Sequence, residues 1–438
     1  MSPSRKLRAV RRAEPVERLF ADGDIPFDGA PMLKIRDGLD DRPLVLVRAG
    51  ARDLKAVHRA IATGARPSGV TVGLGELKTT VRAVRQVSTA LGVPWGCDPL
   101  LYKTAFPGYR TAVSLQALDY TPGRNAHPYT AEELADGELL RQIVRKAVGH
   151  QFDMGAGFIV GADFYIRGIN DPMFAICRRA LALSIDARDA FGPRPLIAPV
   201  RVDLGSFRRP QDQALLVRAL AARRPDGFLL HLSGLHEDAT PETIVGAVRL
   251  MLALQTVGGS VILARPGDLR HIALASGVRG VEIGLGRLLR FSAPDYSKEA
   301  GGPGPVPVRF EFPSLVASLQ GAAAEMALES GRLQECECSC PTCSIAASVG
   351  ERVRHAPEHN MHMSVGSGSA TSVLSPVEKC LELDQRLARA RWLWNGVKHP
   401  SALKAQKRGQ KWREALHYLG DQGLLVPDAA AEALGLTG

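Results

Sequence analysis

The sequence predicts an α/β protein built on a (β/α)8 TIM-like barrel, with a zinc-binding, basic helical subdomain at its C-terminal end. From about residue 42 to residue 290, short apolar runs alternate with amphipathic stretches at helical spacing. Apolar strands that are each followed by a helix are typical of a parallel sheet covered on its faces. About eight such units within roughly 250 residues fit a barrel better than an open sheet.

The predicted strands and helices follow one another along this region. A Gly- and Pro-rich stretch at 301–307 is expected to be a linker after the last strand. Two amphipathic stretches, Gln213–Ala222 and Glu242–Gln255, are predicted as helices. The runs predicted as strands are Pro43–Arg48, Gly69–Leu74, Thr111–Leu115, Phe158–Ala162, Leu196–Val202, Gly227–Leu232, Ser260–Ala264 and Gly280–Leu285.

Composition narrows the class of protein. The chain has 438 residues, of which 45% are hydrophobic, which excludes disorder as the dominant state. No apolar run is long enough for a membrane span, and no apolar segment follows the basic N-terminus, so we expect a cytoplasmic protein. The net charge of +10 favours polyanionic partners.

The chain is predicted to have four parts. They are a basic extension at 1–40, the barrel at 41–330, a zinc subdomain at 331–365 and a basic helical segment at 373–438.

Four cysteines lie within eight residues: Cys336, Cys338, Cys340 and Cys343. Thiols this close together in a cytosolic chain indicate a metal site, because disulfide frameworks belong to oxidising compartments. A C-x-C-x-x-C loop can supply three thiolates to a tetrahedral zinc ion, and such a closed site is structural. The alternative is a group of unliganded buried thiols. The fourth ligand is open at this point, with Cys336, His355, His359 and His362 as candidates.

The segment from Arg386 to Arg413 contains nine Lys or Arg residues and no acidic residue. Trp392, Trp394 and Trp412 lie among them. One interpretation is a solvated helical hairpin whose tryptophans pack on the barrel. We favour a surface that follows the phosphates of a nucleic acid, because a long run of one charge repels itself unless a polyanion compensates it.

The cysteine motif resembles that of a known family. Cys338-Ser-Cys340-Pro-Thr-Cys343, followed by His359-Asn360, is similar to the zinc motif of the tRNA-guanine transglycosylases. These are zinc-carrying (β/α)8 barrels that exchange a guanine in nucleic acid for a 7-deazaguanine base. The resemblance implies His359 as the fourth zinc ligand. Weaker similarities lie at Phe158–Asp163, at Asp226–Glu237, at Gly267–Leu269 with Gly280–Glu282, and at Arg287 and Arg290.

The resemblance also implies a substrate site. Asp163 takes the place of the residue that reads the purine edge, and Ser233 and Gly234 lie in the segment that corresponds to the family's base-holding loop. Arg287 and Arg290 keep the spacing of its two phosphate-binding arginines. The family's D-S-G-G-F-Q loop and the aspartate after its final strand are missing. These departures suggest a divergent branch that inserts 7-deazaguanines into DNA.

Base exchange at a glycosidic bond needs one carboxylate to attack C1′ and one group to move protons. In a parallel barrel both must lie where strands end. Asp98, Asp163, Asp203 and Glu282 follow or end predicted strands, although each alone is as readily a helix cap. We assign Asp98 as general acid/base and Glu282 as nucleophile, with Asp203 as the reserve nucleophile.

The sequence thus predicts a transglycosylase acting by double displacement, with DNA slightly favoured over tRNA as the substrate. Its expected partners are nucleic acid, a 7-deazaguanine base, helicase-like or modification-complex proteins, and a second copy in a homodimer. The alternative from another class is a non-catalytic, zinc-stabilised nucleic-acid-binding subunit of a modification complex. Its best support is the missing aspartate after the final strand.

Overall fold

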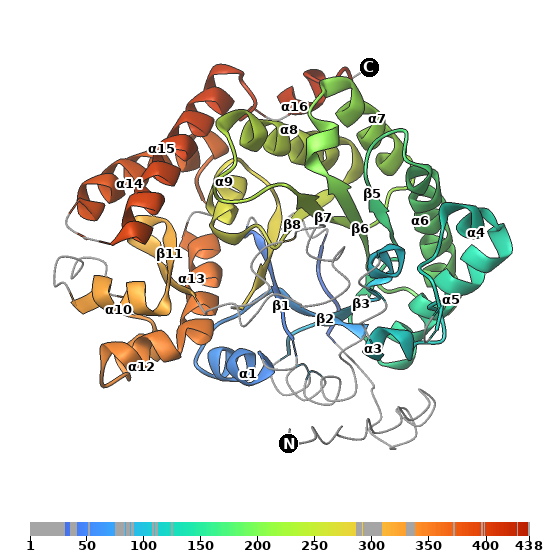
Figure 1. The fold of residues 1–438 in the computed structure, drawn as a ribbon, viewed down its shortest axis with the longest axis horizontal. Coiled ribbons are helices and arrows are strands. Elements are labelled where there is room, and N and C mark those ends of the chain that lie inside the picture. Colours follow the sequence, from blue (N-terminus) through green and yellow to red (C-terminus); the bar gives the residue numbers. More distant parts are fainter. Residues whose placement is uncertain are drawn as a thin grey trace, which may run out of the picture.

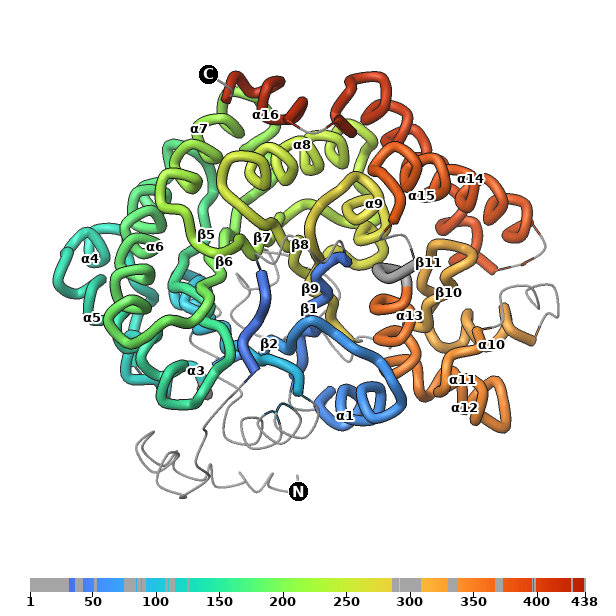
Figure 2. The backbone as a smooth tube through the Cα atoms, turned by 180° about the vertical axis from the view of Figure 1, so that it is seen from behind, coloured from blue at the N-terminus to red at the C-terminus, as the bar shows by residue number. Residues whose placement is uncertain are grey.

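The computed structural model is a mixed α/β protein organised around one curled parallel sheet (Figure 1). Helices lie outside the sheet, and the chain after the last sheet strand forms a helix-rich group at one side (Figure 2). The structure describes residues 31–35, 42–50, 53–74, 84, 88, 92–106, 109, 113–123, 126–285, 291, 309–329, 338–370, 373–395, 397, 399–426 and 428–436.

The sheet has the order β3-β2-β1-β9-β8-β7-β6-β4, and β5 also pairs with β6. Every pairing in it is parallel, and β1 pairs with β9, so the first and last strands are neighbours and the sheet curls. The strands are β1 (Leu44–Arg48), β2 (Gly69–Gly73), β3 (Trp95–Asp98), β4 (Ile159–Val160), β5 (Tyr165–Ile166), β6 (Leu196–Asp203), β7 (Gly227–Ser233), β8 (Ser260–Ala264) and β9 (Gly280–Gly284).

The predicted closed barrel needs correction, because no ladder joins β3 to β4 among the residues that the structure describes. The N–H groups of Ile159 and Gly161 donate hydrogen bonds to carbonyls of the β6 segment. The N–H and C=O of Val160, between them, therefore point to the opposite edge of β4. There the buried side chain of Gln151 bonds both groups, each at 2.8 Å. A side-chain amide thus replaces the neighbouring strand, and among the described residues one backbone bond, from Gly157 N to Trp95 O at 2.7 Å, links the two edges.

Most predicted strands coincide with observed ones, but Thr111–Leu115 was wrong: Val113–Gln116 is a short helix, α3. The third strand is instead Trp95–Asp98, whose Trp-Gly-Cys-Asp sequence has little β-branched character. Its four residues are all buried. Tertiary packing therefore selects a strand that local propensity does not indicate.

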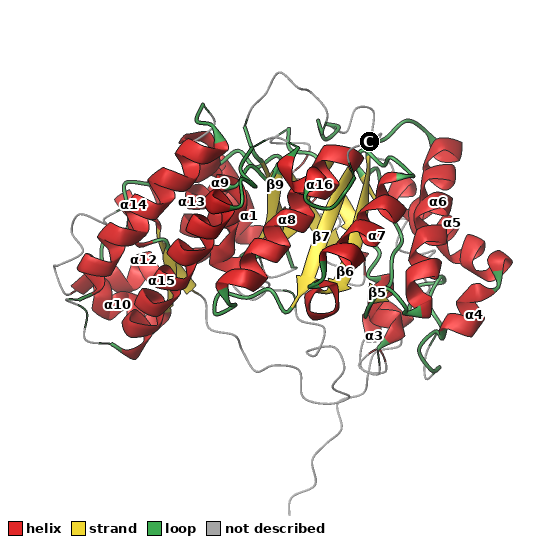
Figure 3. Ribbon diagram, turned by 90° about the horizontal axis from the view of Figure 1, so that it is seen from above, coloured by secondary structure: helices red, strands yellow, loops and turns green. Residues whose placement is uncertain are grey.

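The helices cover the outer face of the sheet, with the strands between them in the view of Figure 3. The N-terminal caps of the larger ones are Asp136, Asp171, Thr240 and Ser375, whose side chains accept backbone N–H groups. The helices around the sheet are α1 (Leu54–Ala62), α4 (Ala131–Ala135), α5 (Gly137–Asp153), α6 (Pro172–Phe191), α7 (Pro210–Ala221), α8 (Pro241–Gly258) and α9 (Arg270–Ala275).

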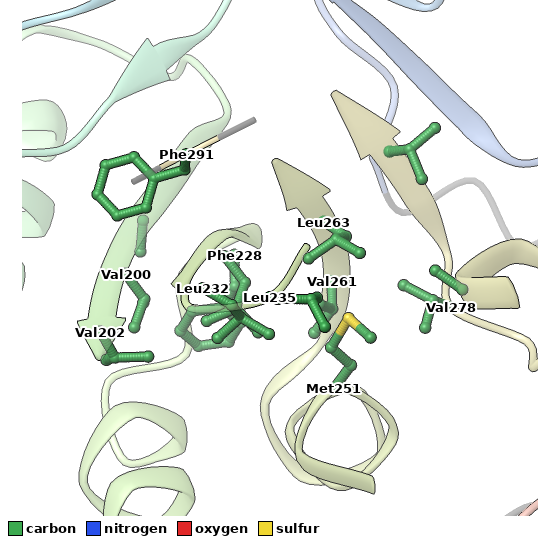
Figure 4. Close-up of a cluster of buried hydrophobic side chains, with 14 of the residues drawn as sticks. Val200, Val202, Phe228, Leu232, Leu235, Met251, Val261, Leu263, Val278 and Phe291 are labelled. Carbon is green, nitrogen blue, oxygen red and sulfur yellow. The ribbon is translucent and has the colours of Figure 1, made fainter. Parts of the chain in front are cut away.

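Apolar side chains fill both faces of the sheet. On the helix side, Val261 and Leu263 of β8 lie close to Met251 of α8 (Figure 4). Inside the curl, a separate apolar cluster fills the end where the strands begin. Leu33 and Ile35 belong to this cluster and cover that end, so polar side chains inside the curl lie toward the opposite end. The other members are Leu44, Leu46, Phe158, Val160, Ile197, Leu229, Ile262 and Ala264.

The remaining chain forms the helix-rich group beside β1 and β9 (Figure 2). A two-stranded antiparallel hairpin joins β10 (Arg309–Phe312) to β11 (Ala317–Gln320). Helices α14 (Pro376–Trp394) and α15 (Pro400–Asp421) pack against each other and against α9 and α8. The other helices of this group are α10 (Gly321–Glu329), α11 (Pro341–Ser344), α12 (Val349–Arg354) and α13 (Ala356–Ala370). The last helix, α16 (Ala429–Glu432), packs on α8 instead. In the described chain, no helix combines the length and apolarity that a membrane crossing requires.

Candidate functional site

A polar layer lies inside the curled sheet, at the end where the strands finish. Each strand of the curl alternates side chains between its two faces, so residues two apart share the interior. The apolar cluster fills the first interior positions, and charged or polar side chains occupy the later ones. They are Arg48 of β1, Thr71 of β2, Asp98 of β3, Arg201 of β6, His231 of β7 and Glu282 of β9, all buried.

Asp98 is held as an anion at the last position of β3. Arg201 Nη2 donates to its Oδ2 at 2.6 Å and Arg48 Nη1 donates to the same oxygen at 3.1 Å. The backbone N–H of Leu100 donates to Oδ1 at 2.9 Å. Burial opposes ionisation, but the two guanidinium groups outweigh it, and the pKa of Asp98 is lowered.

Asp163 follows β4 and shares Arg201 with Asp98. Arg201 Nη1 donates to Asp163 Oδ1, and Oδ2 has no hydrogen-bond partner among the described residues. Burial raises the pKa of Asp163 to about 7, against the effect of Arg201, and the nearby charge of Asp98 adds to the rise. The carboxyl group of Asp163 can therefore change its protonation near neutral pH.

Glu282 enters the interior from β9, and its Oε1 accepts a hydrogen bond from the hydroxyl of Thr71, two strands away. Its Oε2 is buried and has no hydrogen-bond partner in the described part of the chain. The backbone carbonyl of Glu282 accepts from Arg265 N at 2.7 Å, which joins β9 to the end of β8. Glu282 thus presents one uncommitted carboxylate oxygen to the polar layer.

His231 of β7 is fully buried, and neither ring nitrogen has a hydrogen-bond partner among the described residues. Its ring lies 5.2 Å from that of Phe291, between centroids. Burial and the nearby Arg201, Arg265 and Arg48 keep its pKa well below the usual value. His231 is neutral, so it offers the layer a hydrogen-bonding group without charge.

The reserve nucleophile and the other predicted substrate residues are placed differently. Asp203 caps the short helix after β6, because Gly205 N donates to its Oδ1 at 3.0 Å. This capping role explains its position without any catalytic role. Ser233 is buried and hydrogen-bonds Tyr165, whereas Gly234 is exposed with a φ of +92°. Arg287 and Arg290 lie outside the described residues.

The second group of chemically capable side chains is a candidate metal centre formed by Cys338, Cys340, Cys343 and His359. One ligand atom from each residue lies within 4.8 Å of all the others. Two thiolates bound tetrahedrally to zinc at 2.3 Å lie about 3.8 Å apart, so the group is close to the size that an ion requires. Three thiols and an imidazole form a donor set typical of structural zinc.

The orientation of His359 fits a ligand. Its Nδ1 faces Cys340 Sγ at 3.5 Å and Cys343 Sγ at 3.3 Å. Its Nε2 lies 2.8 Å from the carbonyl oxygen of Glu311, and metal-binding histidines usually donate their second N–H in this way. The ring stacks on Phe310 at 4.0 Å between centroids. These contacts direct Nδ1 toward the three thiols.

The histidines left open by the sequence are engaged elsewhere. His362 Nε2 lies 3.0 Å from the hydroxyl of Thr63 on α1, and His355 Nδ1 lies 3.7 Å from Glu358. Cys336 lies outside the described residues. Of the described candidates, His359 alone points at the thiols, as the resemblance implies.

The basic segment is largely used within the molecule. Arg408 binds Asp238 at 2.7 Å, and Arg413 binds Asp384 at 2.8 Å. Arg386 donates to Pro313 O at 2.6 Å, and Lys411 donates to Asp238 O at 3.1 Å. Trp412 is buried in the core around the sheet, as the packing interpretation expects, whereas Trp394 is buried in the separate core of the C-terminal group and Trp392 is 70% exposed. The self-repulsion that favoured a phosphate surface is thus partly relieved by internal contacts.

Sequence reasoning missed the cations of the polar layer. Arg201 and Arg48 lie within apolar strands, and a charged residue inside such a run is a signal that it is buried with a partner. Thr71 carried no such signal, because threonine is common in strands.

Comparison with protein-family models finds no match for this chain, and comparison with the curated proteins finds none either.

Proposed function

We propose that this protein exchanges a guanine in nucleic acid for a 7-deazaguanine base at the polar layer of the curled sheet. The observation that carries the proposal is the convergence of Asp98, Asp163 and Arg201 at the strand ends, with Glu282 on the same interior face. Glycosyl transfer needs an anionic carboxylate and a proton carrier, and the layer holds both. The resemblance to the tRNA-guanine transglycosylases supplies the substrate class.

The pKa directions favour a division of labour different from the one expected from the sequence. Asp98, whose pKa is lowered, is suited to attack C1′ as the C1′–N9 bond breaks. Asp163, whose pKa is raised to about 7, is suited to protonate the departing guanine. In the second half, the incoming base loses its N9 proton to Asp163, and N9 displaces the carboxylate from C1′. Glu282 remains the alternative nucleophile.

We further propose that the Cys3His centre binds one structural zinc ion. Cys338, Cys340, Cys343 and His359 would hold it, and the ion would join the cysteine loop to α13 and, through the bond from His359 to Glu311, to β10. A closed four-ligand site has no open position for substrate. Its contribution is to folding rather than to the reaction.

One observation favours the non-catalytic alternative. Arg201 is fully buried and bonds both aspartates, an arrangement that also occurs in purely structural ion-pair networks. In that case the chain binds nucleic acid without exchanging bases. The two functions differ in a measurable product.

The test is incubation with radiolabelled guanine and with a 7-deazaguanine base, using tRNA in one series and duplex or single-stranded DNA in the other. Incorporation that falls by roughly a thousandfold or more in Asp98→Asn supports the enzyme. Asp421→Asn, which changes an exposed carboxylate at the end of α15, is the matched control and should retain wild-type activity. Nucleic-acid binding without incorporation into any substrate would contradict base exchange and support the binding subunit.

A further inference from the structure

A cleft of about 590 Å³ lies on the outer side of the sheet, away from the polar layer. Its walls come from the loops after β6 and β7, the first turns of α7 and α8, and the last turns of α15. Loops that follow parallel strands lie at the edge where those strands end, so the cleft and the carboxylates share one edge of the sheet. Its volume is that of a nucleotide-sized ligand site.

A positioned guanidinium group lines this cleft. Arg249 Nε donates to Gln213 Oε1 at 3.0 Å. Gln213 is fully buried and is itself held by bonds to Phe207 O at 2.9 Å and Gly246 O at 3.1 Å. One hydrogen bond, to a glutamine that two backbone carbonyls hold in place, therefore positions the head of Arg249.

Arg249 has no carboxylate partner among the described residues, and its two terminal nitrogens make no hydrogen bond to them. Its side chain is partly buried, and burial lowers its pKa. A partly buried cation that no protein anion compensates is costly unless a ligand supplies the charge. The fork of an arginine matches the oxygens of a phosphate.

The other polar groups of the wall are consistent with a phosphate ester. Arg208 is exposed and adds a second cation. Thr240 and Thr243, whose hydroxyls lie 3.1 Å apart, add donors, and the ring of Tyr418 is 44% exposed. Glu242 is the acidic member of this wall. It is fully exposed and bonded at the N-terminus of α8, which lowers its pKa, so it faces solvent as an anion.

We propose that this cleft binds a phosphate of a nucleotide unit, with the Arg249 fork as its main contact and Arg208 as a second. The face of Tyr418 is available for a base or sugar. We assign this phosphate to the nucleic-acid strand whose target nucleotide enters the polar layer. This assignment rests on the proposed function. A free nucleotide has the same chemistry, so the two sources must be separated by experiment.

The test measures binding of two probes to the full chain by calorimetry at low salt: guanosine monophosphate, and a twelve-nucleotide single-stranded DNA without terminal phosphate. Loss of a charge-assisted bidentate contact in Arg249→Gln should weaken binding by roughly tenfold to a hundredfold. Arg178→Gln removes the same charge from an exposed position on α6 and should leave binding unchanged. Glu242→Gln should strengthen binding. Thermal melting checks that each variant folds.

Weaker binding of the DNA alone identifies a strand phosphate, and weaker binding of the mononucleotide identifies a free nucleotide site. Equal affinity of wild type and Arg249→Gln for both probes overturns the inference. Asp98→Asn is expected to abolish exchange, which tests the base-exchange proposal separately from the cleft. If wild type shows no exchange but Arg249→Gln still loses DNA affinity, the base-exchange proposal fails while the phosphate cleft stands.

Discussion

Arg201 illustrates how one side chain sets the protonation of its neighbours. Its single positive charge lies between two buried carboxylates, Asp98 and Asp163. Asp98 contacts a second cation, Arg48, and remains an anion, whereas Asp163 has Arg201 as its one cationic partner among the described residues. Burial raises the pKa of Asp163 more than Arg201 lowers it, whereas at Asp98 Arg201 and Arg48 together outweigh burial and lower the pKa.

This difference predicts how stability depends on pH. The pKa of Asp163 rises from 3.8 in the unfolded chain to about 7 in the folded one, so the folded state binds more protons between these values. Its contribution to the free energy of unfolding should therefore be present below pH 4 and be lost as the pH rises to 7, by up to about 4 kcal/mol. Asp163→Asn should remove this slope in urea titrations at successive pH values, whereas Asp421→Asn should follow wild type. Parallel curves for wild type and Asp163→Asn would contradict the assignment.

At the scale of single elements, Gln151 determines where the sheet stops. It lies on α5 and bonds both the N–H and the C=O of Val160 in β4. Because those groups are satisfied, β4 gains nothing there from pairing with β3. A helix residue thus occupies the edge of β4 at which a further strand would pair.

Replacing Gln151 with methionine keeps the volume of the side chain but leaves the buried N–H and C=O of Val160 without partners. Such a loss should lower the free energy of unfolding by about 1–3 kcal/mol for each unsatisfied group. Gln142→Met on the exposed face of the same helix is the control and should change stability by less than about 0.5 kcal/mol. Urea denaturation measures both. Equal stabilities would show that the amide is dispensable.

At the scale of the whole molecule, the cysteine centre connects parts that are distant in the sequence. His359 bonds the backbone of β10 at Glu311, and Asn360 bonds the same strand at Glu311 N and Arg309 O. The side chain of Glu311 in turn pairs with Arg270 at the start of α9, beside the sheet. A bound ion would therefore stabilise the contact between the C-terminal group and the sheet.

Metal analysis of protein purified without chelator should find one zinc ion per chain. Cys340→Ser should lose the ion and melt at a lower temperature, because a structural metal binds the folded state and not the unfolded one. Cys380→Ser, which changes a buried cysteine of α14 outside the centre, should retain one ion. Full zinc content in Cys340→Ser, or none in wild type, would refute the centre.

Local patterns determined much of this protein. The alternation of apolar runs and amphipathic stretches predicted the α/β class and seven of the nine strands of the sheet, because burial on both faces makes a parallel strand continuously apolar. The spacing of three cysteines indicated the metal loop. The positions of Asp98, Asp163 and Glu282 at strand ends followed from chain order.

Tertiary structure decided what no local pattern contains. Whether the curl closes depends on Gln151, and the short strand at Trp95–Asp98 forms because it is buried between neighbours. Pairing of both aspartates with Arg201 requires β3, β4 and β6 to be brought together across more than a hundred residues of chain. The physical reason is that hydrogen-bond satisfaction and charge compensation are properties of spatial neighbours, whereas periodicity and spacing are properties of the chain.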